Sequence, residues 1–175
     1  MQLPGYDQLE DFLAHKMRMS HIYQPVMLMA LLSKGGKCNE REIASELLAR
    51  REPGCLFCEM KSERIVAENE LAFAISDGYP VTPLHTLIIP RRHVSTFFEL
   101  GQAEINACTF LVKNQKKLIE TEDHSVDGFN IGMNNGVSAG QTINHCHIHL
   151  IPRRTGDVEN PRGGVRHTIP GKGYY

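Results

Sequence analysis

The spacing of hydrophobic positions changes near residue 53. Before that point apolar side chains recur at helical intervals, and the first amphipathic stripe consists of Leu9, Phe12, Leu13 and Met17. A second helix is expected from Pro25, and Asn39 with Glu42 has the spacing of a capping box that opens a third. A polar stretch ending in Pro-Gly then interrupts this pattern. We therefore expect an N-terminal helical extension over residues 1–52 and a separate domain over residues 53–175.

After residue 54 the pattern changes to short apolar runs typical of β-structure. Five runs predict strands, which lie at residues 65–68, 71–75, 86–89, 129–133 and 143–151. Between the third and fourth runs one long amphipathic helix is predicted over residues 102–120, with Ile105, Cys108, Leu111, Val112 and Leu118 at helical spacing. Several strands with a single long helix indicate an α+β fold rather than alternating βαβ units.

The last predicted strand carries three histidines in alternation, His145, His147 and His149. Alternate side chains of a strand share a face, so these imidazoles would lie on one face roughly 7 Å apart, and the residues between them would face the core. Packing alone does not readily explain three adjacent imidazoles. A three-histidine metal site fits less well, because side chains spread this far do not reach one ion at about 2 Å.

A loop of small and polar residues leads into the histidine strand. It runs from Asn134 to Thr142, and its two glycines let backbone N–H groups approach an anion. Gln141 and Thr142 add side-chain donors. The loop by itself is also consistent with a plain hairpin turn. Its position beside the histidines favours a phosphoryl-transfer site.

Composition limits the classes of protein to be considered. The chain has 19 Lys and Arg against 20 Asp and Glu, for a net charge of −1. This balance excludes the strongly basic character of a protein that coats nucleic acid, although not a local basic patch. No apolar run approaches the length of about 18 residues that spans a membrane, and the N-terminus lacks the layout of a signal peptide. We therefore expect a cytoplasmic protein.

The five cysteines include one pair with the spacing of zinc ligands, Cys55-x-x-Cys58. An odd cysteine count and this pair suit a reduced chain with a metal site better than a disulfide scaffold. The pair alone is also consistent with a redox site, or with two small apolar residues beside Phe57. A closed tetrahedral zinc site needs two further ligands.

Several of these motifs together resemble the histidine triad (HIT) superfamily of nucleotide hydrolases and transferases. The stretch AGQTINHCHIHLIPR at residues 139–153 matches its His-x-His-x-His signature, and TPLHTLIIPRRH at residues 82–93 matches an upstream segment. Leu84 departs from the family pattern, which usually has glycine before the histidine. The resemblance covers residues 55 to about 153. It implies a five-stranded antiparallel sheet with one long helix, and a homodimer.

The resemblance also implies a two-step reaction. His147 would attack the α-phosphate of a dinucleoside polyphosphate (Ap4A-like) or an adenosine phosphoramidate, and water would release a nucleoside monophosphate from the nucleotidyl-histidine. His149 would assist the leaving group, and His85 would support the triad from a neighbouring strand. The alternatives are a nucleotidyl transferase or phosphorylase that uses the same intermediate, and a nucleotide-sensing or nucleic-acid-linked module.

The family's binding roles fall on matching positions of this chain. The side chains of Gln141 and Thr142, with backbone N–H groups around Gly140, would bind phosphate oxygens. Asn134 would hold the phosphate or ribose side of the substrate, and Asp77 would accept hydrogen bonds from the ribose hydroxyls. The scheme requires no organic cofactor and no catalytic metal, although Mg²⁺ can arrive with a phosphate substrate.

Members of the family that carry the cysteine pair take two further zinc ligands from histidines. The resemblance therefore implies a structural zinc held by Cys55, Cys58, His93 and His145, which would fix the orientation of the catalytic strand.

Basic residues near the two ends of the chain allow further interpretations. The N-terminal helices resemble part of a helix-turn-helix, but packing on the domain or on a partner subunit is favoured over nucleic-acid binding. Four arginines near the C-terminus could contact extra phosphates of a polyphosphate, or belong to a solvated tail; they are Arg153, Arg154, Arg162 and Arg166.

Overall fold

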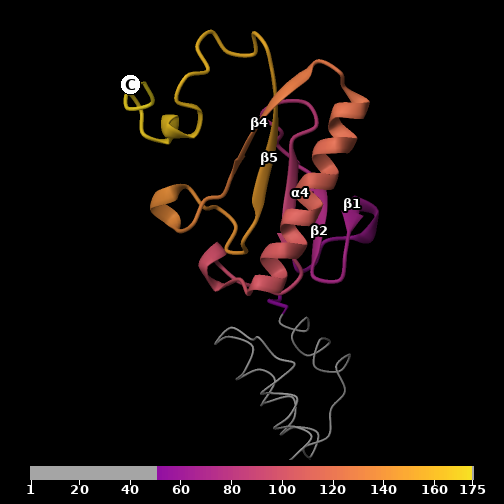
Figure 1. Cartoon of the computed structure of the whole chain (residues 1–175). Helices are drawn as coiled ribbons and strands as arrows, with labels where there is room; N and C mark the ends of the chain where they lie inside the picture. The colour runs from indigo at the N-terminus through magenta and orange to yellow at the C-terminus, as the bar shows by residue number, and fades with distance from the viewer. Residues whose placement is uncertain (1–50, 175) are drawn as a thin grey trace, which may run out of the picture. The chain divides into compact units, whose positions relative to one another are not determined.

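A five-stranded antiparallel sheet and one long helix build the domain (Figure 1). The computed structural model describes residues 51–174 of the chain. The strands are β1 (Ile65–Glu68), β2 (Ala72–Ser76), β3 (Thr86–Pro90), β4 (Val126–Gly132) and β5 (Ile148–Arg154), and they lie in the order β1-β2-β3-β5-β4. The helix is α4 (Gln102–Glu122). The predicted α+β class and antiparallel sheet are confirmed.

The N-terminal helices expected within residues 1–50 lie outside the described residues. The domain boundary at residue 53 and a nucleic-acid role for the extension therefore stay predictions. Within the described part of the chain, no helix is both long and apolar enough to cross a membrane.

The strand predicted over residues 143–151 was placed too early, because β5 begins at Ile148. Its pairing with β3 joins Thr86 to Leu150 and Ile88 to Ile148, so continuing the register would place Cys146 opposite Pro90. Proline has no N–H to donate, and the Pro90 carbonyl instead accepts a hydrogen bond from Nε2 of His145 at 2.9 Å. The Cys146 N–H accordingly donates to the Val94 carbonyl at 2.7 Å.

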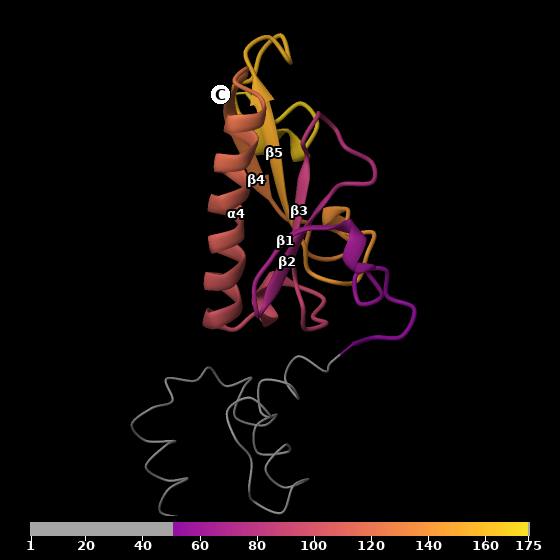
Figure 2. The ribbon, with the colours of Figure 1, turned by 90° about the vertical axis from the view of Figure 1, so that its right-hand side faces the viewer.

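The two faces of the sheet bury different sets of side chains, as the period of two predicts. One face packs against α4 (Figure 2), and its buried residues include Ala72, Ala74, Ile88, Ile148 and Leu150. The helix contributes Cys108, Leu111 and Ile119 to this core. The opposite face holds a second cluster, made of Phe57, Phe73, Ile75, Leu87 and Ile89. Alternation therefore directs His147 and His149 away from α4, toward the second cluster.

A buried ion pair fixes the start of α4 beside the end of β3. The Arg92 guanidinium donates to both carboxylate oxygens of Glu104, at 2.9 and 2.7 Å. Glu104 also accepts the Gly101 N–H at 2.8 Å, which caps the first turn of the helix. Burying a charge without a partner lowers the stability of the fold. Because Arg92 and Glu104 are paired and hydrogen-bonded to each other, neither charge is left uncompensated.

Leu84 has the backbone conformation that glycine favours, with φ at 68°. The loop that presents His85 therefore keeps a glycine-like turn although the residue is leucine. The Leu84 side chain packs against the core on the α4 side of the sheet. Packing of this side chain offsets part of the steric cost of a left-handed backbone, which is about 1–2 kcal/mol.

We predict that Leu84→Gly is more stable than Leu84→Ala by about 1 kcal/mol in the free energy of unfolding. Both variants lose the leucine packing, but only glycine removes the clash between Cβ and the backbone. Urea unfolding of the two variants measures the difference. An alanine variant as stable as the glycine variant would contradict a strained Leu84.

Candidate active site and metal centre

His147 lies just before β5 with its imidazole 7% exposed. Its Nδ1 is 2.8 Å from the His145 carbonyl oxygen. Because a carbonyl oxygen can only accept, Nδ1 carries the proton and Nε2 keeps a free electron pair. The ring packs edge-on against Phe57, with centroids 5.2 Å apart. The arrangement presents one defined nitrogen, Nε2, as a nucleophile.

His149, the second residue of β5, lies beside His147 with ring centroids 5.1 Å apart. Its Nδ1 is 3.0 Å from Nε2 of His85. Burial and, to a smaller extent, the neighbouring His147 and His85 lower the pKa of His149 to about 4, and the Asp77 carboxylate opposes this shift. The His149 imidazole is therefore neutral near pH 7.

His85 comes directly before β3 and is almost completely buried. Burial lowers its pKa, and the nearby Asp77 carboxylate opposes that shift. Asp77 Oδ2 is 3.2 Å from Nδ1 of His85, and Asp77 Oδ1 accepts the Tyr79 N–H at 2.9 Å. The residue expected at the ribose thus faces His85 as well.

A cavity of about 670 Å³ opens on the same side of the sheet, with Asp77 in its lining. This volume is in the range of pockets for small ligands. Its apolar lining comes from separate parts of the chain and includes Leu56, Phe57, Met60, Ile75, Leu87 and Ile143. No sequence motif marks this pocket. The available signal was the alternation in 72–76 and 86–90, which directs Ile75 and Leu87 to one face.

The loop of residues 134–142 is shaped by two glycines with positive φ, Gly136 at 88° and Gly140 at 84°. Gln141, which is predicted to bind phosphate, makes hydrogen bonds that brace this loop: its Nε2 donates to the Ser95 and Ile143 carbonyls at 2.7 and 3.1 Å. Its Oε1 accepts the Gly136 N–H at 2.7 Å. Both side-chain donor hydrogens of Gln141 are thereby used within the protein.

Thr142 and Asn134 are the other loop side chains predicted to bind substrate. Thr142 is exposed and lines a cavity of about 560 Å³ beside Cys55 and His93, not the apolar cavity. Asn134 lies close to Gly140, with its amide nitrogen 3.9 Å from the position a Cβ would take there. A phosphate-binding role for Asn134, Gln141 and Thr142 stays a prediction.

Four predicted metal ligands converge next to the histidine strand. The Sγ of Cys55 is 3.4 Å and that of Cys58 is 3.6 Å from Nδ1 of His145, and Cys58 Sγ is 3.3 Å from Nδ1 of His93. Tetrahedral zinc with bonds of about 2.0–2.3 Å separates its ligand atoms by about 3.3–3.8 Å. The His145 Nε2–H donates to Pro90, so Nδ1 is the nitrogen free for a metal. Cys55, Cys58, His93 and His145 can therefore hold a metal ion.

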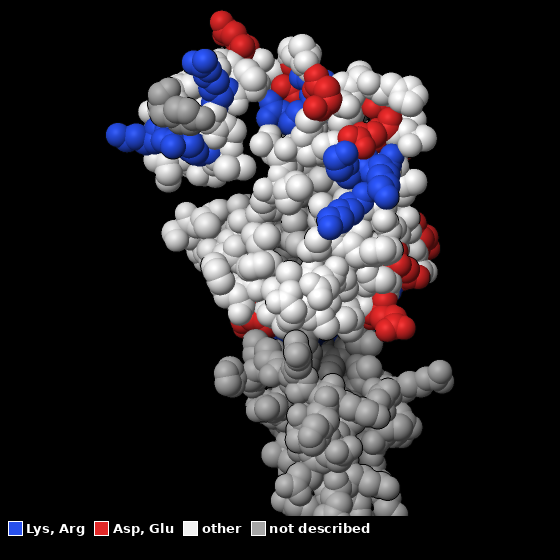
Figure 3. Space-filling view, viewed as in Figure 1, with Lys and Arg blue, Asp and Glu red and all other residues white. Residues whose placement is uncertain are grey.

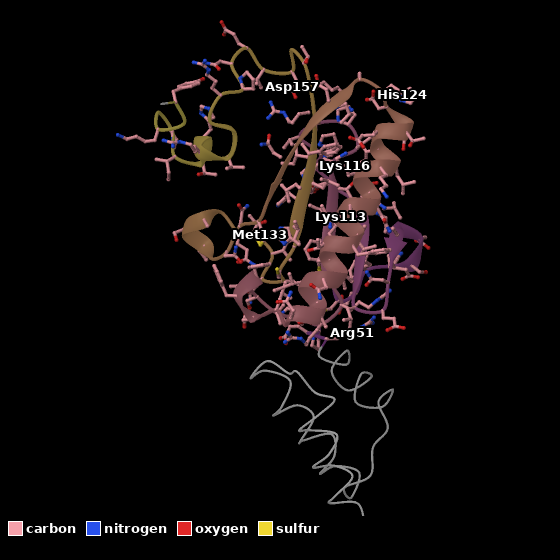
Figure 4. All side chains as sticks on the ribbon, viewed as in Figure 1. Arg51, Lys113, Lys116, His124, Met133 and Asp157 are labelled. Carbon is pink, nitrogen blue, oxygen red and sulfur yellow. The ribbon has the colours of Figure 1, made fainter. Side chains whose placement is uncertain are left out.

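The two arginines at the end of β5 make their hydrogen bonds inside the protein. Arg153 pairs with Asp157 at 2.7 Å, and Arg154 pairs with Asp123 at 2.6 Å. Figure 4 shows Asp157 and Met133 at opposite ends of the β4–β5 pair, and Met133 follows the end of β4 that adjoins His149. Neither arginine therefore reaches the triad. Arg162 and Arg166 lie in the exposed C-terminal tail.

Comparison with known proteins agrees with this geometry. The model of the HIT domain family matches residues 59–156, more than half of the chain. The chain belongs to the HIT domain family. An uncharacterized HIT-like protein from Methanocaldococcus jannaschii is 39% identical over 110 residues, which cover 60% of this chain and 83% of the relative.

Several relatives of this chain carry enzyme names. A bis(5'-adenosyl)-triphosphatase from Dictyostelium discoideum is 34% identical over 101 residues, covering 58% of this chain and 67% of that protein. An AP-4-A phosphorylase from Mycobacterium tuberculosis is 34% identical over 95 residues, covering 54% of this chain and 48% of that protein. The similarity supports nucleotide hydrolysis or transfer in general.

A solved HIT structure is similar in fold and is described as zinc-bound. This histidine triad family protein from Mycobacterium smegmatis has a TM-score of 0.54 and 31% identity, covering 59% of this chain and 78% of that one. A zinc ion is therefore bound in at least one solved protein of this fold.

We predict that Gln141→Ala lowers the free energy of unfolding by about 1–3 kcal/mol, because it leaves three backbone groups without their partner. Thr142→Val is the matched control, and its exposed side chain should change stability by no more than about 0.5 kcal/mol. Urea unfolding measures both. A Gln141→Ala variant as stable as the wild type would show that the side chain does not brace the loop.

Proposed function

We propose that the chain is a nucleotide hydrolase that forms a covalent nucleotidyl-histidine at Nε2 of His147. The hydrogen bond from Nδ1–H of His147 to the His145 carbonyl carries this proposal, since it leaves Nε2 as the nucleophilic nitrogen. The buried position of the ring keeps it oriented without a change of rotamer.

The reaction has two displacements at the α-phosphorus. In the first, Nε2 of His147 forms a bond to phosphorus while the bond to the leaving oxygen or nitrogen breaks, and His149 supplies a proton to that atom. In the second, water forms a bond to phosphorus, the P–N bond breaks and nucleoside monophosphate leaves. Backbone N–H groups of the loop around Gly140 stabilise the phosphate oxygens.

The apolar cavity is the proposed site for the base, and Asp77, which lines it, would accept hydrogen bonds from the ribose hydroxyl groups. We infer an adenosine-type substrate, either a dinucleoside polyphosphate or a phosphoramidate. The name of the Dictyostelium relative supports the first of these. Any Mg²⁺ would accompany the phosphates, and no organic cofactor is needed.

A nucleotidyl transferase or phosphorylase is the second candidate, favoured by the similarity to the AP-4-A phosphorylase. The same adduct would then pass its nucleotide to inorganic phosphate instead of water. A nucleoside diphosphate formed in excess phosphate would identify this activity. The nucleotide-sensing alternative depends on residues 1–50, which the structure does not describe.

We further propose that the metal at Cys55, Cys58, His93 and His145 is a structural zinc. Two thiolates and two imidazoles are the ligand set of a closed tetrahedral zinc site, and such a site leaves no open position for substrate. A zinc ion there would hold residues 55–58 against the segment that carries His147. Thiolate ligands also suit a reducing compartment, so we place the protein in the cytoplasm.

We propose that the protein forms a homodimer through the exposed edge of β4 and the apolar side chains near it. β4 is an edge strand, and Ile131 on it is half exposed. Val137 in the following loop and Phe98 are largely exposed, and the Phe97 N–H donates to Asn135, which brings their two loops together. Figure 3 shows that the surface around this loop lacks charged side chains. A second copy covering this area would bury apolar surface and an unpaired strand edge.

We predict that His147→Ala lowers hydrolysis of diadenosine tetraphosphate and of an adenosine phosphoramidate by at least about 10³-fold. Mass spectrometry of quenched wild-type reactions should find a nucleotidyl adduct on the peptide that contains His147. His124→Ala is the matched control, since His124 is exposed beyond the end of α4 (Figure 4). Full activity in His147→Ala would rule out the proposed nucleophile.

We predict that the purified protein contains about one zinc per chain, and that Cys58→Ser loses the metal and melts at a lower temperature. Cys108→Ser is the control, because Cys108 is buried in the core beneath α4, away from the ligands. Elemental analysis and thermal melting with and without a chelator measure the effect. Full zinc content in Cys58→Ser would exclude this residue as a ligand.

A further inference from the structure

The loop between β2 and β3, residues 77–85, forms one wall of the apolar cavity. Asp77, Gly78 and Tyr79 line the cavity on this side. The wall has little side-chain packing of its own, because Gly78 has no side chain and Tyr79 is 93% exposed. Its position therefore depends on how the two ends of the loop are held.

The sheet itself fixes the first end of the loop. Asp77 directly follows β2, and its N–H donates to the His85 carbonyl at 2.9 Å. The second end contains Leu84, whose φ of 68° places it in the left-handed region. A backbone conformation of this kind is kept only where surrounding contacts hold it. The contacts of Thr82 and Pro83, which precede Leu84, are therefore decisive for this end of the loop.

Arg154, the last residue of β5, makes these contacts. The pairing of β3 with β5 joins Thr86 to Leu150, so continuing the register by four residues places Arg154 opposite Thr82. Nη1 of Arg154 donates to Thr82 Oγ1 at 2.8 Å, and Nη2 donates to the Pro83 carbonyl at 3.4 Å. The strand that begins beside His147 thus holds the cavity loop with its other end.

Asp123, which follows the last residue of α4, holds the Arg154 guanidinium in turn. Nε and Nη2 of Arg154 donate to Asp123 Oδ2 at 3.0 and 2.6 Å. Hydrogen bonds from the Ser125 hydroxyl and from Arg154 lower the pKa of Asp123 to about 2, so the carboxylate is ionised near pH 7. Figure 4 shows the next residue, His124, at the same end of the domain as Asp157, which lies beyond β5. Because a guanidinium directs several N–H groups in fixed directions, it reaches the helix end and the loop together.

We propose that Arg154 is a positioning residue for the nucleoside, which holds Thr82 and Pro83 and thereby fixes the cavity wall at Gly78 and Tyr79. The inference rests on the proposed function and deepens it by naming a residue outside the cavity that determines nucleoside affinity. The donors of Arg154 are directed at Asp123 and the loop, which favours this role over a contact with extra phosphates.

The loop is short and stiff enough to transmit a displacement from Thr82 to the cavity wall. Only Pro80 and Val81 separate Tyr79 from Thr82, and the proline ring restricts φ at Pro80. The Tyr79 N–H also donates to Asp77 Oδ1 at 2.9 Å, which joins the wall to the carboxylate proposed for the ribose. A wall that is not held in advance must be ordered by the ligand, and this ordering weakens binding.

Hydrogen exchange tests the anchor without any substrate. Thr82→Val removes the hydroxyl with little change of shape, and Arg154→Lys keeps the charge opposite Asp123 but lacks the fork that reaches Thr82. We expect both variants to exchange the backbone amides of residues 77–82 about 10-fold faster than the wild type, because the loop opens more often. Mass spectrometry of peptide fragments measures the exchange.

Thr82→Ser and Arg153→Lys are the matched controls. Serine keeps the hydroxyl, and Arg153 precedes Arg154 on β5 but donates to Asp157 and Asn130. Both controls should exchange residues 77–82 at the wild-type rate. Wild-type exchange in Thr82→Val and Arg154→Lys would overturn the proposed anchor.

Kinetics with diadenosine tetraphosphate distinguishes positioning from a general loss of folded protein. Thr82→Val and Arg154→Lys should raise KM about 10-fold and leave kcat within about twofold of the wild type. Partial unfolding would instead lower kcat at unchanged KM, and that result would contradict a role in nucleoside binding. Since both changes break the same contact, the double variant should have a KM within about twofold of that of Arg154→Lys.

Calorimetric titration with AMP separates this inference from the proposed reaction. A wild type that binds AMP but hydrolyses no nucleotide would contradict the reaction, yet an AMP Kd about 10-fold weaker in Thr82→Val would still support the positioning role. Equal AMP affinity in the wild type, Thr82→Val and Arg154→Lys would overturn it, as would a wild type that does not bind AMP.

Discussion

The hydrogen bond from Nδ1–H of His147 to the His145 carbonyl is the interaction on which the account of this site depends. It decides which nitrogen of His147 has a free electron pair, and it joins the nucleophile to the backbone of a predicted metal ligand. His145 is in turn held by its own side chain, which donates to the Pro90 carbonyl at the end of β3. The position of the reactive nitrogen therefore follows from backbone contacts and not from exposed side chains.

Two groups of side chains flank His147. On one side of His147, the cysteine pair approaches the rings of His145 and His93, so a metal bound there would stabilise the backbone next to His147. On the other side, His149 is hydrogen-bonded to His85, and the Asp77 carboxylate lies 3.2 Å from the far nitrogen of His85. We propose that the metal ligands hold this backbone in place and that His149 supplies a proton to the leaving group. This division explains why three histidines in alternation do not share one task.

Much of this arrangement could be predicted from the sequence, because it depends on local patterns. Alternation identified the strands and the histidine face, and spacing identified the ligand pair. Three features needed contacts between distant residues. The late start of β5 follows from Pro90 opposite Cys146, the bracing role of Gln141 follows from the Ser95 carbonyl, and the apolar cavity collects side chains from residues 56 to 143. The conformation of Leu84 could not be predicted either, because leucine rarely adopts the left-handed backbone that this residue has.

The stereochemical course at phosphorus tests the central claim most directly. Hydrolysis of a substrate with an α-phosphorothioate of defined configuration, in ¹⁸O-labelled water, yields a nucleoside monophosphorothioate whose configuration can be determined by ³¹P NMR. Two in-line displacements, first by His147 and then by water, predict retention of configuration. Inversion would show that water attacks the substrate directly, and would contradict a covalent nucleotidyl-histidine.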